Sequence, residues 1–277
     1  LIHRFADKKG LKRLWLILSV VANMAVLLVF IRSGHSSYDV TSIFTGKGAM
    51  LKLFPVWGAG IFTLHGISYC MDIYRKEIEP EKNFILVSQY ICFFPCFGCG
   101  PILRFSAMSE QLRKPVITSG KLAEGIKLML IGFAEKLFLS DPMYEMWQHI
   151  RGVSADSLSA ACAWLGIIAF SFAFYYELRA YSHIAQGIGS MLGFELPDNF
   201  DLPFMSAGFN ELIKRFACTF YSWVRDYFYR PICRNKDSVC LWALILSVLA
   251  GSVWYGYGRH TMLWAAFICV MLGIEYL

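Results

Sequence analysis

Three stretches of this chain run for about the thickness of a membrane without a charged residue. They cover residues 14–31, 157–176 and 238–258 and are 18, 20 and 21 residues long. A helix needs about 20 mostly apolar residues to cross the hydrocarbon core of a bilayer. Hydrophobic residues make up 57% of the 277 positions and charged residues 17%, whereas soluble domains average about 45–50% and about 25%. The sequence therefore predicts an all-α, multi-pass integral membrane protein.

A fourth uncharged stretch, residues 84–103, contains several helix breakers. Pro95 lacks the N–H that a helix interior needs, and Pro101 disfavours helical geometry at Gly100. Broken backbone at membrane depth is tolerated only where protein buries it or where it lines a wet cavity. We therefore expect a re-entrant or kinked segment beside a cavity, with Arg104 at its end.

Residues 122–139 are apolar but carry four charges. On an insertion scale, each charge at the centre of a membrane helix costs about 2.5–3.5 kcal/mol. The segment is therefore expected to lie along the interface or to turn its charged face into the protein. Glu135 and Lys136 point about 100° apart on a helix, so each needs a separate partner. Glu177 and Arg179 directly follow an uncharged stretch and are interpreted as interface markers, with a buried pair as the alternative.

Residues 207–223 have the periodicity of an amphipathic interfacial helix. Its charged residues fall at positions i, i+3 and i+4, and its apolar residues form a separate face. The adjacent charged pair Arg225 and Asp226 follows. An aromatic belt with a local ion pair is the simpler interpretation, and a role at a channel mouth is the alternative. The charged face consists of Glu211, Lys214 and Arg215, and the apolar face of Leu212, Phe216 and Phe220.

The formal net charge of +6 lies mostly beside the apolar stretches. Basic residues at such positions tend to stay on the cytoplasmic side of a membrane. Because no basic stripe follows a soluble surface, the charge does not point to nucleic-acid binding.

Three cysteines stand at the spacing C-x3-C-x2-C, which is also used to hold iron–sulfur clusters. They lie inside the apolar, proline-broken stretch, where a free cysteine packs as a small hydrophobe. Packing is the favoured interpretation, and no metal site is expected. The three residues are Cys92, Cys96 and Cys99.

Four blocks of the chain match motifs of one known family. They occupy residues 64–84 ("LHGISYCMDIYRKEIEPEKNF"), 93–104 ("FFPCFGCGPILR"), 187–204 ("GIGSMLGFELPDNFDLPF") and 221–232 ("YSWVRDYFYRPI"). The second block is similar to that family's FFPxxxxGPIxR stretch, and the other blocks agree with it in order. Taken together, the four blocks resemble the membrane-bound O-acyltransferase family, in its alginate O-acetyltransferase and teichoic-acid D-alanyltransferase branch.

The resemblance implies a helix bundle pierced by a channel, formed by one transmembrane domain over residues 1–277 that is truncated at both ends relative to the family. It implies acetyl-type transfer to a hydroxyl of a cell-envelope polysaccharide in the bacterial cytoplasmic membrane. The donor would be a thioester co-substrate, acyl-CoA or a carrier protein, with no bound cofactor. Expected partners are the lipid bilayer, an acyl carrier protein and an extracytoplasmic acyltransferase. The implied channel residues are Gly100, Pro101, Arg104, Asn199, Arg225, Asp226 and Trp254.

Two positions depart from the family pattern where a histidine is expected to act as general base. Tyr255 stands in the "VWYG" match and Ala217 precedes the RDY block. Tyrosine ionises near pH 10 and alanine carries no proton. Two hypotheses therefore stay open: an active acyltransferase, in which Tyr255 occupies the catalytic position, and a catalytically impaired homologue that binds the acyl donor or scaffolds a partner.

Replacement of the missing base by another histidine is the alternative to a purely structural role for the histidines in or near apolar segments. These histidines are His65, His183 and His260.

Overall fold

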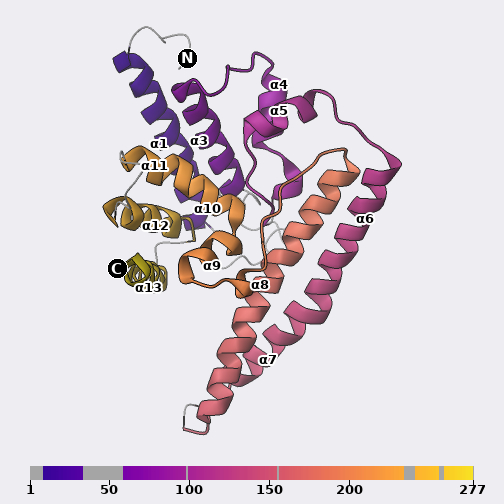
Figure 1. The fold of residues 1–277 in the computed structure, drawn as a ribbon, viewed down its shortest axis with the longest axis vertical. Coiled ribbons are helices and arrows are strands. Elements are labelled where there is room, and N and C mark those ends of the chain that lie inside the picture. The colour runs from indigo at the N-terminus through magenta and orange to yellow at the C-terminus, as the bar shows by residue number, and fades with distance from the viewer. Residues whose placement is uncertain are drawn as a thin grey trace, which may run out of the picture. The chain divides into compact units, whose positions relative to one another are not determined.

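The computed structural model describes residues 9–33, 59–97, 99–154, 156–233, 241–255 and 259–276, and every regular element in these ranges is helical (Figure 1). The α-helices are α1 (Lys9–Ser33), α3 (Ala59–Arg75), α4 (Phe84–Ile91), α5 (Phe105–Arg113), α6 (Ser119–Ala134), α7 (Asp141–Arg151), α8 (Ala160–Met191), α9 (Phe209–Phe216), α10 (Cys218–Val224), α11 (Arg230–Ile232), α12 (Leu241–Tyr255) and α13 (Arg259–Tyr276). Tighter 3-10 turns form η1 (Phe94–Cys96) and η3 (Pro203–Met205), and wider π-helical turns form η2 (Glu135–Ser140) and η4 (Arg225–Tyr229).

Two of the described helices are long and apolar enough to cross a membrane. They are α8 and the part of α1 from Gly10 to Leu27. The third predicted span, residues 238–258, extends at both ends beyond the described residues, and its described part is the 15-residue helix α12. The predicted membrane helix protein is thus confirmed in outline.

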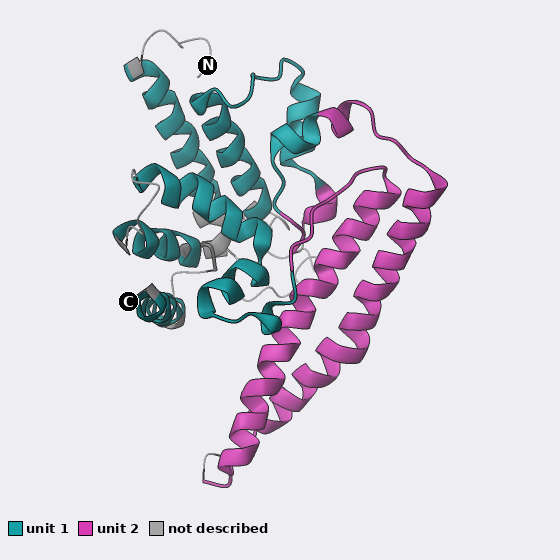
Figure 2. Cartoon of the chain, viewed as in Figure 1, with its two compact units in different colours: residues 1–93, 102–109, 201–277 teal, residues 94–101, 110–200 magenta. Residues whose placement is uncertain are grey.

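The chain divides into two compact units (Figure 2). Unit 1 comprises residues 1–93, 102–109 and 201–277. In it, α1 packs on α3, and α12 packs on α13 and η4. A buried apolar cluster in this unit joins residues that are far apart in the sequence, so helices α3 and α10 are tied to the segment that precedes α5. The cluster consists of Leu64, Ile67, Ile102, Trp223 and Tyr227.

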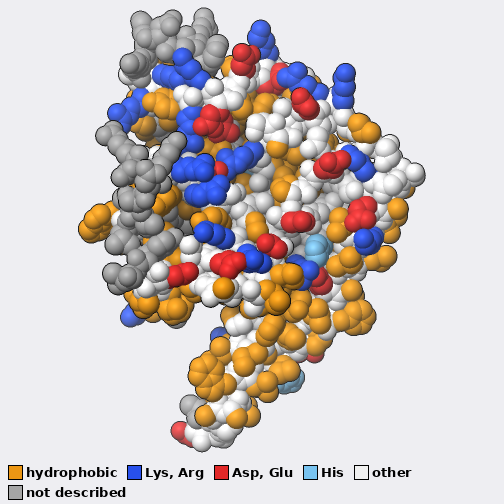
Figure 3. Space-filling view, in the orientation of Figure 1, with side chains coloured by type: hydrophobic (Ala, Val, Ile, Leu, Met, Phe, Trp, Pro, Cys, Tyr) orange, Lys and Arg blue, Asp and Glu red, His pale blue; other side chains and the backbone are white. Residues whose placement is uncertain are grey.

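Unit 2 comprises residues 94–101 and 110–200 and is built on the long helix α8, against which α6 and α7 pack. Much of its outer surface is apolar, as the lower part of Figure 3 shows. In the first half of α8, Trp164, Ile167 and Ile168 remain at least half exposed. Large exposed apolar surfaces indicate contact with protein or membrane, and this one lies on a helix of membrane-spanning length.

Helices α6 and α8 approach closely because glycines face each other. A Cβ atom on Gly125 would lie 2.6 Å from the carbonyl oxygen of Gly187, and one on Gly187 would lie 2.6 Å from that of Gly125. Gly132 meets the Ala180 carbonyl oxygen in the same way at 2.7 Å. This pairing makes the two helices antiparallel. Small residues of this kind let membrane helices pack with their backbones in contact.

Replacing Gly125 with alanine is expected to destabilise unit 2 by about 1–3 kcal/mol, as overpacking typically does. The new methyl group would meet backbone, which cannot turn away. Thermal unfolding of the detergent-solubilised protein measures the loss. Gly120→Ala, in the first turn of the same helix, is the control, because its Cβ would meet only the Thr118 hydroxyl at 3.9 Å. Equal melting temperatures for the two variants would contradict this packing.

The π-helical turns η2 and η4 each hold charged residues. In η2 the Asp141 N–H bonds the Lys136 carbonyl, and in η4 the Arg230 N–H bonds the Arg225 carbonyl. Each bond reaches back five residues instead of four. Such turns are rare in proteins as a whole, but those that occur are frequently found at functional sites.

The predicted break in residues 84–103 is confirmed. Helix α4 ends at Ile91, only the short turn η1 follows, and residues 100–104 are not helical. The single helix predicted over residues 207–223 is wrong, because α9 and α10 are separated at Ala217, which has φ −150° and ψ 72°. A cause is visible: the Asp201 N–H bonds the Arg215 carbonyl at 2.9 Å. An uninterrupted helix would use that carbonyl for residue 219.

Candidate functional site

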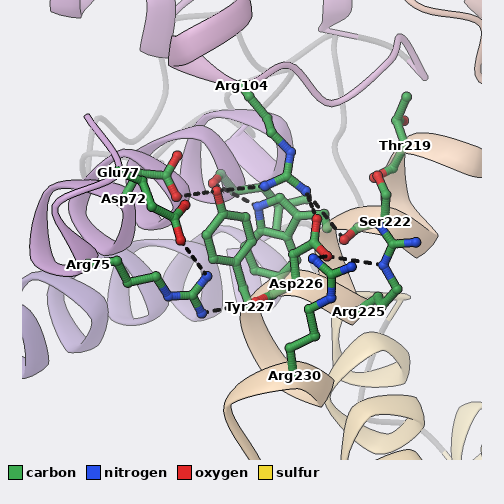
Figure 4. A network of polar contacts seen from close by, with 12 residues as sticks. Asp72, Arg75, Glu77, Arg104, Thr219, Ser222, Arg225, Asp226, Tyr227 and Arg230 are labelled. Carbon is green, nitrogen blue, oxygen red and sulfur yellow. Dashed lines mark hydrogen bonds and ion pairs between the residues drawn. The ribbon is translucent and has the colours of Figure 1, made fainter. Parts of the chain in front are cut away.

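Arg104 lies in a network of polar contacts inside unit 1 (Figure 4). Its guanidinium contacts the Asp226 carboxylate at 2.5 Å and donates to the Tyr227 hydroxyl at 2.9 Å. It also donates to the Ser222 carbonyl at 3.3 Å. A planar guanidinium holds several acceptors in fixed directions, which a lysine ammonium does not do. The sequence-predicted residues Arg104 and Asp226 are therefore direct partners.

Asp226 is shared by three arginines. Besides Arg104, the Nε of Arg225 and the Nη1 of Arg230 each lie 3.0 Å from its Oδ1 atom. Arg75 donates to its backbone carbonyl at 2.9 Å. One carboxylate does not neutralise three guanidiniums, so the cluster carries a net positive charge. The Asp226 side chain is only 14% exposed, whereas those of Arg225 and Arg230 are 41% and 64% exposed. The excess positive charge thus faces outward, where an anion could reach it.

The Tyr227 hydroxyl connects this cluster to α3. It donates to Asp72 at 2.6 Å while accepting from Arg104. The guanidiniums of Arg75 and Arg104 lie 5.2 Å and 5.0 Å from the ring centroid, within the range of cation–π attraction. Burial and the hydrogen bond to Asp72 raise the pKa of Tyr227. The hydroxyl is therefore neutral at physiological pH and acts as a hydrogen-bonding bridge.

The non-helical segment before Arg104 is held by side chains. The Ile102 N–H donates to the Thr219 hydroxyl at 3.0 Å, and the Leu103 N–H donates to His65 Nε2 at 3.0 Å. The Leu103 carbonyl accepts from the Tyr90 hydroxyl at 2.9 Å. Buried backbone groups need such partners, so these three side chains replace the missing helical bonds and fix the direction in which Arg104 leaves the backbone.

His65 has a structural role in this arrangement. Its side chain is fully buried and stacks on Tyr90 with ring centroids 5.0 Å apart. Because Nε2 accepts the Leu103 N–H, the ring is neutral and this nitrogen is not available to take a proton. The structural interpretation of His65 is therefore confirmed.

Replacing Thr219 with valine is expected to cost about 1–3 kcal/mol of stability, since it keeps the shape of the side chain but leaves the buried Ile102 N–H without its acceptor. Chemical or thermal unfolding measures the effect. Thr219→Ser keeps the hydroxyl and is expected to retain most of the stability. A valine variant as stable as the serine variant would show that the hydroxyl does not support this segment.

An apolar cleft of about 410 Å³ lies beside the network in unit 1. Helices α1, α3, α10 and α12 and the turn η4 contribute its walls, and Tyr227 is one of its lining residues. Its other lining residues include Val20, Met24, Leu64, Phe220 and Gly251. The cleft is thus lined mainly by apolar side chains, and Tyr227 is the residue that it shares with the polar network.

Three of the other predicted channel residues belong to unit 2. Gly100 and Pro101 are buried in unit 2, and Asn199 is buried there at the end of a loop that Gln186 holds through Pro197 and Asp198. The structure therefore brings together Arg104, Arg225 and Asp226 from the predicted set.

Trp254 and Tyr255 end helix α12, and their side chains fall outside the described residues, as does the His260 side chain. Tyr227 and Asp72 were not singled out from the sequence, although both lie inside the quoted "MDIYR" and "RDYFYR" blocks.

The three cysteines of the C-x3-C-x2-C run are all free. Cys96 is fully buried, as the packing interpretation expects, whereas Cys92 is exposed. Within the described ranges, no three histidine, cysteine, aspartate or glutamate residues gather where they could hold a metal ion.

The membrane-bound O-acyltransferase (MBOAT) family model matches residues 13–276, nearly the whole chain. The chain belongs to this family. It is therefore a membrane protein, and its residues Arg104, Arg225 and Asp226 lie within the matched region.

Comparison with curated proteins gives relatives of the same kind. The chain is 30% identical over 268 residues to a probable alginate O-acetylase AlgI of Pseudomonas aeruginosa, covering 94% of this chain and 51% of that protein. It is 26% identical over 303 residues to a peptidoglycan O-acetyltransferase of Helicobacter pylori, covering 99% and 57%. A teichoic acid D-alanyltransferase of Streptococcus thermophilus is 22% identical over 222 residues, covering 74% and 53%. The chain spans about half the length of the curated relatives it matches.

Proposed function

We propose that this MBOAT chain transfers an acetyl-type acyl group from a thioester donor to a hydroxyl of a cell-envelope polysaccharide. Family membership supports acyl transfer, and the names of two relatives, an alginate O-acetylase and a peptidoglycan O-acetyltransferase, support acetyl transfer to envelope polymers. The proposed place of action is the bacterial cytoplasmic membrane, because the relatives are bacterial and the chain has helices of membrane-spanning length.

The observation that carries the proposal is the excess of positive charge around Asp226. Three guanidiniums share one carboxylate, and two of them are well exposed. Phosphate groups bind such arginines through charge-assisted hydrogen bonds. We infer that Arg225 and Arg230 receive the phosphates of the donor, either acyl-CoA or the phosphopantetheine arm of a carrier protein. An extracytoplasmic acyltransferase is the proposed second partner.

Acyl transfer is tested with membranes that carry the protein, a radiolabelled acetyl donor and isolated envelope polysaccharide. We expect label in the polysaccharide. The absence of label, together with donor binding in the same membranes, would overturn the transfer proposal and support the impaired homologue, which retains donor binding without chemistry.

Donor recognition is tested by removing the two exposed arginines together, in Arg225→Ala with Arg230→Ala. We expect KM for the donor to rise about 10-fold or more with a smaller change in kcat, because these contacts bind the donor away from the reacting carbon. Arg151→Ala, an exposed arginine at the end of α7, is the matched control and should leave KM unchanged. An unchanged KM in the double variant would contradict this donor site.

A further inference from the structure

Unit 2 contains a second cluster of ionisable side chains, and its centre is a histidine paired with a buried carboxylate. His183 Nδ1 lies 2.8 Å from Oε2 of Glu135. The second oxygen, Oε1, lies 3.3 Å from Nε of Arg179. The Glu135 side chain is only 10% exposed. A carboxylate held at both oxygens in this way fixes the orientation of the histidine ring.

The cluster lies on a helix of membrane-spanning length. His183 and Arg179 belong to α8, and Glu135 begins the π-helical turn η2. Ionisable residues are costly within membrane segments and mark functional sites there more often than elsewhere. The next charged group along η2, Lys136, contacts Asp141 at 2.5 Å and Glu177 at 2.8 Å. Glu135 and Lys136 therefore have separate partners, as the sequence predicted. Glu177 and Arg179 each pair with a residue of η2 and not with each other, so the alternative of a buried Glu177–Arg179 pair is wrong.

His183 differs from the other histidines whose side chains the structure describes. His65 is sealed and its Nε2 is occupied by a backbone N–H. His149 is exposed near the end of α7 and stands outside the cluster. The His183 side chain is 18% exposed. Within the described ranges, no contact occupies its Nε2 atom. A carboxylate on Nδ1 holds the proton there and leaves the lone pair of Nε2 free to act as a base.

We propose that His183 is the acid–base group of this chain, with Glu135 and Arg179 as the residues that position it. This inference rests on the proposed acyl transfer. His183 Nε2 takes the proton from the acceptor hydroxyl as its oxygen attacks the thioester carbonyl carbon. The C–S bond then breaks, and the proton passes from Nε2 to the leaving thiolate. The acyl group ends as an ester, the donor as a free thiol, and the histidine as it began.

Other titratable groups lie near this part of α8, and their protonation could also affect the pH dependence of the rate. Lys136, Asp141 and Glu177 bind one another on η2, α7 and α8. Tyr181 lies on α8 near Glu177. Turn η1, which packs on α8, adds the thiol of Cys96, and the thiol of Cys99 follows it in the chain. These groups are therefore the other candidates for a titration step in a measured pH profile.

The test compares His183→Gln with His149→Gln in the membrane transfer assay from pH 5 to 9. For the wild type, kcat should rise with pH along a single acid limb. His183→Gln should lower kcat about 10²–10⁴-fold, the usual effect of removing a positioned acid–base group, and should abolish the limb. His149→Gln should change neither. Glu135→Gln should shift the limb, which a merely structural ion pair would not do. Equal rates and limbs for His183→Gln and the wild type would overturn the inference while leaving acyl transfer intact.

A second readout separates this inference from the proposed function. Diethyl pyrocarbonate modifies unprotonated imidazole, and mass spectrometry locates the adduct. We expect an adduct on His183, because its side chain is partly exposed and Glu135 contacts Nδ1, not Nε2. If the wild type transferred no acyl group, the proposed function and this catalytic role would both fail. If transfer occurred but His183 resisted modification at every pH, the inference alone would be overturned.

Discussion

Asp226→Ala is expected to lower the free energy of unfolding by about 2–3 kcal/mol and to abolish most acyl transfer. Removing one partner of a buried ion pair costs about 3–5 kcal/mol. A lower figure applies here because Arg225 and Arg230 are partly in solvent, which screens their mutual repulsion. Arg104 would lose its shortest contact and with it the geometry of the cluster. Thermal unfolding and the membrane transfer assay measure the two effects.

Arg230→Ala is the control for this prediction. It removes the most exposed of the three guanidiniums, at 64% exposure, and should change stability by no more than about 0.5 kcal/mol, as surface substitutions usually do. Similar losses of stability in Asp226→Ala and Arg230→Ala would show that Asp226 does not hold the cluster together.

Gly100→Ala is expected to destabilise unit 2 by about 3 kcal/mol, at the upper end of the range for overpacking. The added Cβ would lie 2.5 Å from the Cys96 Cα atom, 2.9 Å from the Cys96 Cβ atom and 3.1 Å from the Ala185 Cβ atom. None of these atoms belongs to a flexible side-chain end, so the segment between η1 and Pro101 would have to move away from α8.

Thermal unfolding and limited proteolysis of the segment around residue 100 measure this loss. Gly152→Ala is the matched control in the same unit, because its Cβ would meet its nearest neighbours, the Gln148 and His149 carbonyls, only at 3.5 Å. We expect that variant to melt with the wild type. Gly100→Ala melting with them would mean that residues 96–101 do not pack as described.

The features that could be predicted from the sequence are those set by local chemistry. Proline and glycine in residues 84–103 determine the helix break wherever the segment lies. Adjacent charges at Glu135 and Lys136 must point in different directions on any helix. Charge-free stretches predict membrane helices, and two of the described helices meet that length. Each of these predictions depends on residues within a few turns of one another.

The features that could not be predicted depend on residues far apart in the chain. Tyr227 and Asp72 are 155 positions apart, yet their side chains share a hydrogen bond. The break at Ala217 depends on a loop residue, Asp201, that takes a carbonyl from α9. The helical periodicity of residues 207–223 could not indicate that contact, because Asp201 lies outside this stretch. Tertiary partners therefore decided both the site and the helix boundary.

The site residues predicted from the family resemblance fall into two groups. Arg104, Arg225 and Asp226 were predicted from matched motifs, and the structure joins them in one cluster. Gly100, Pro101 and Asn199 were predicted from the same motifs, and the structure shows them as buried residues of unit 2, so their place in a channel stays a prediction. A matched motif thus identifies positions that matter without distinguishing a backbone constraint from a charged contact.

The wide turns η2 and η4 have a consequence for changes in chain length. A π-turn accommodates one residue more than an α-turn, so deletion of one residue from η4 would convert it to an ordinary turn. The extra residue is absorbed inside the turn, so the residues on either side of it would keep their faces of the helix. After deletion of Phe228, for example, Arg230 would follow Asp226 by three positions instead of four, and the two side chains would still lie on one face. Related chains that lack this extra residue should therefore carry their outer cation three positions after the aspartate.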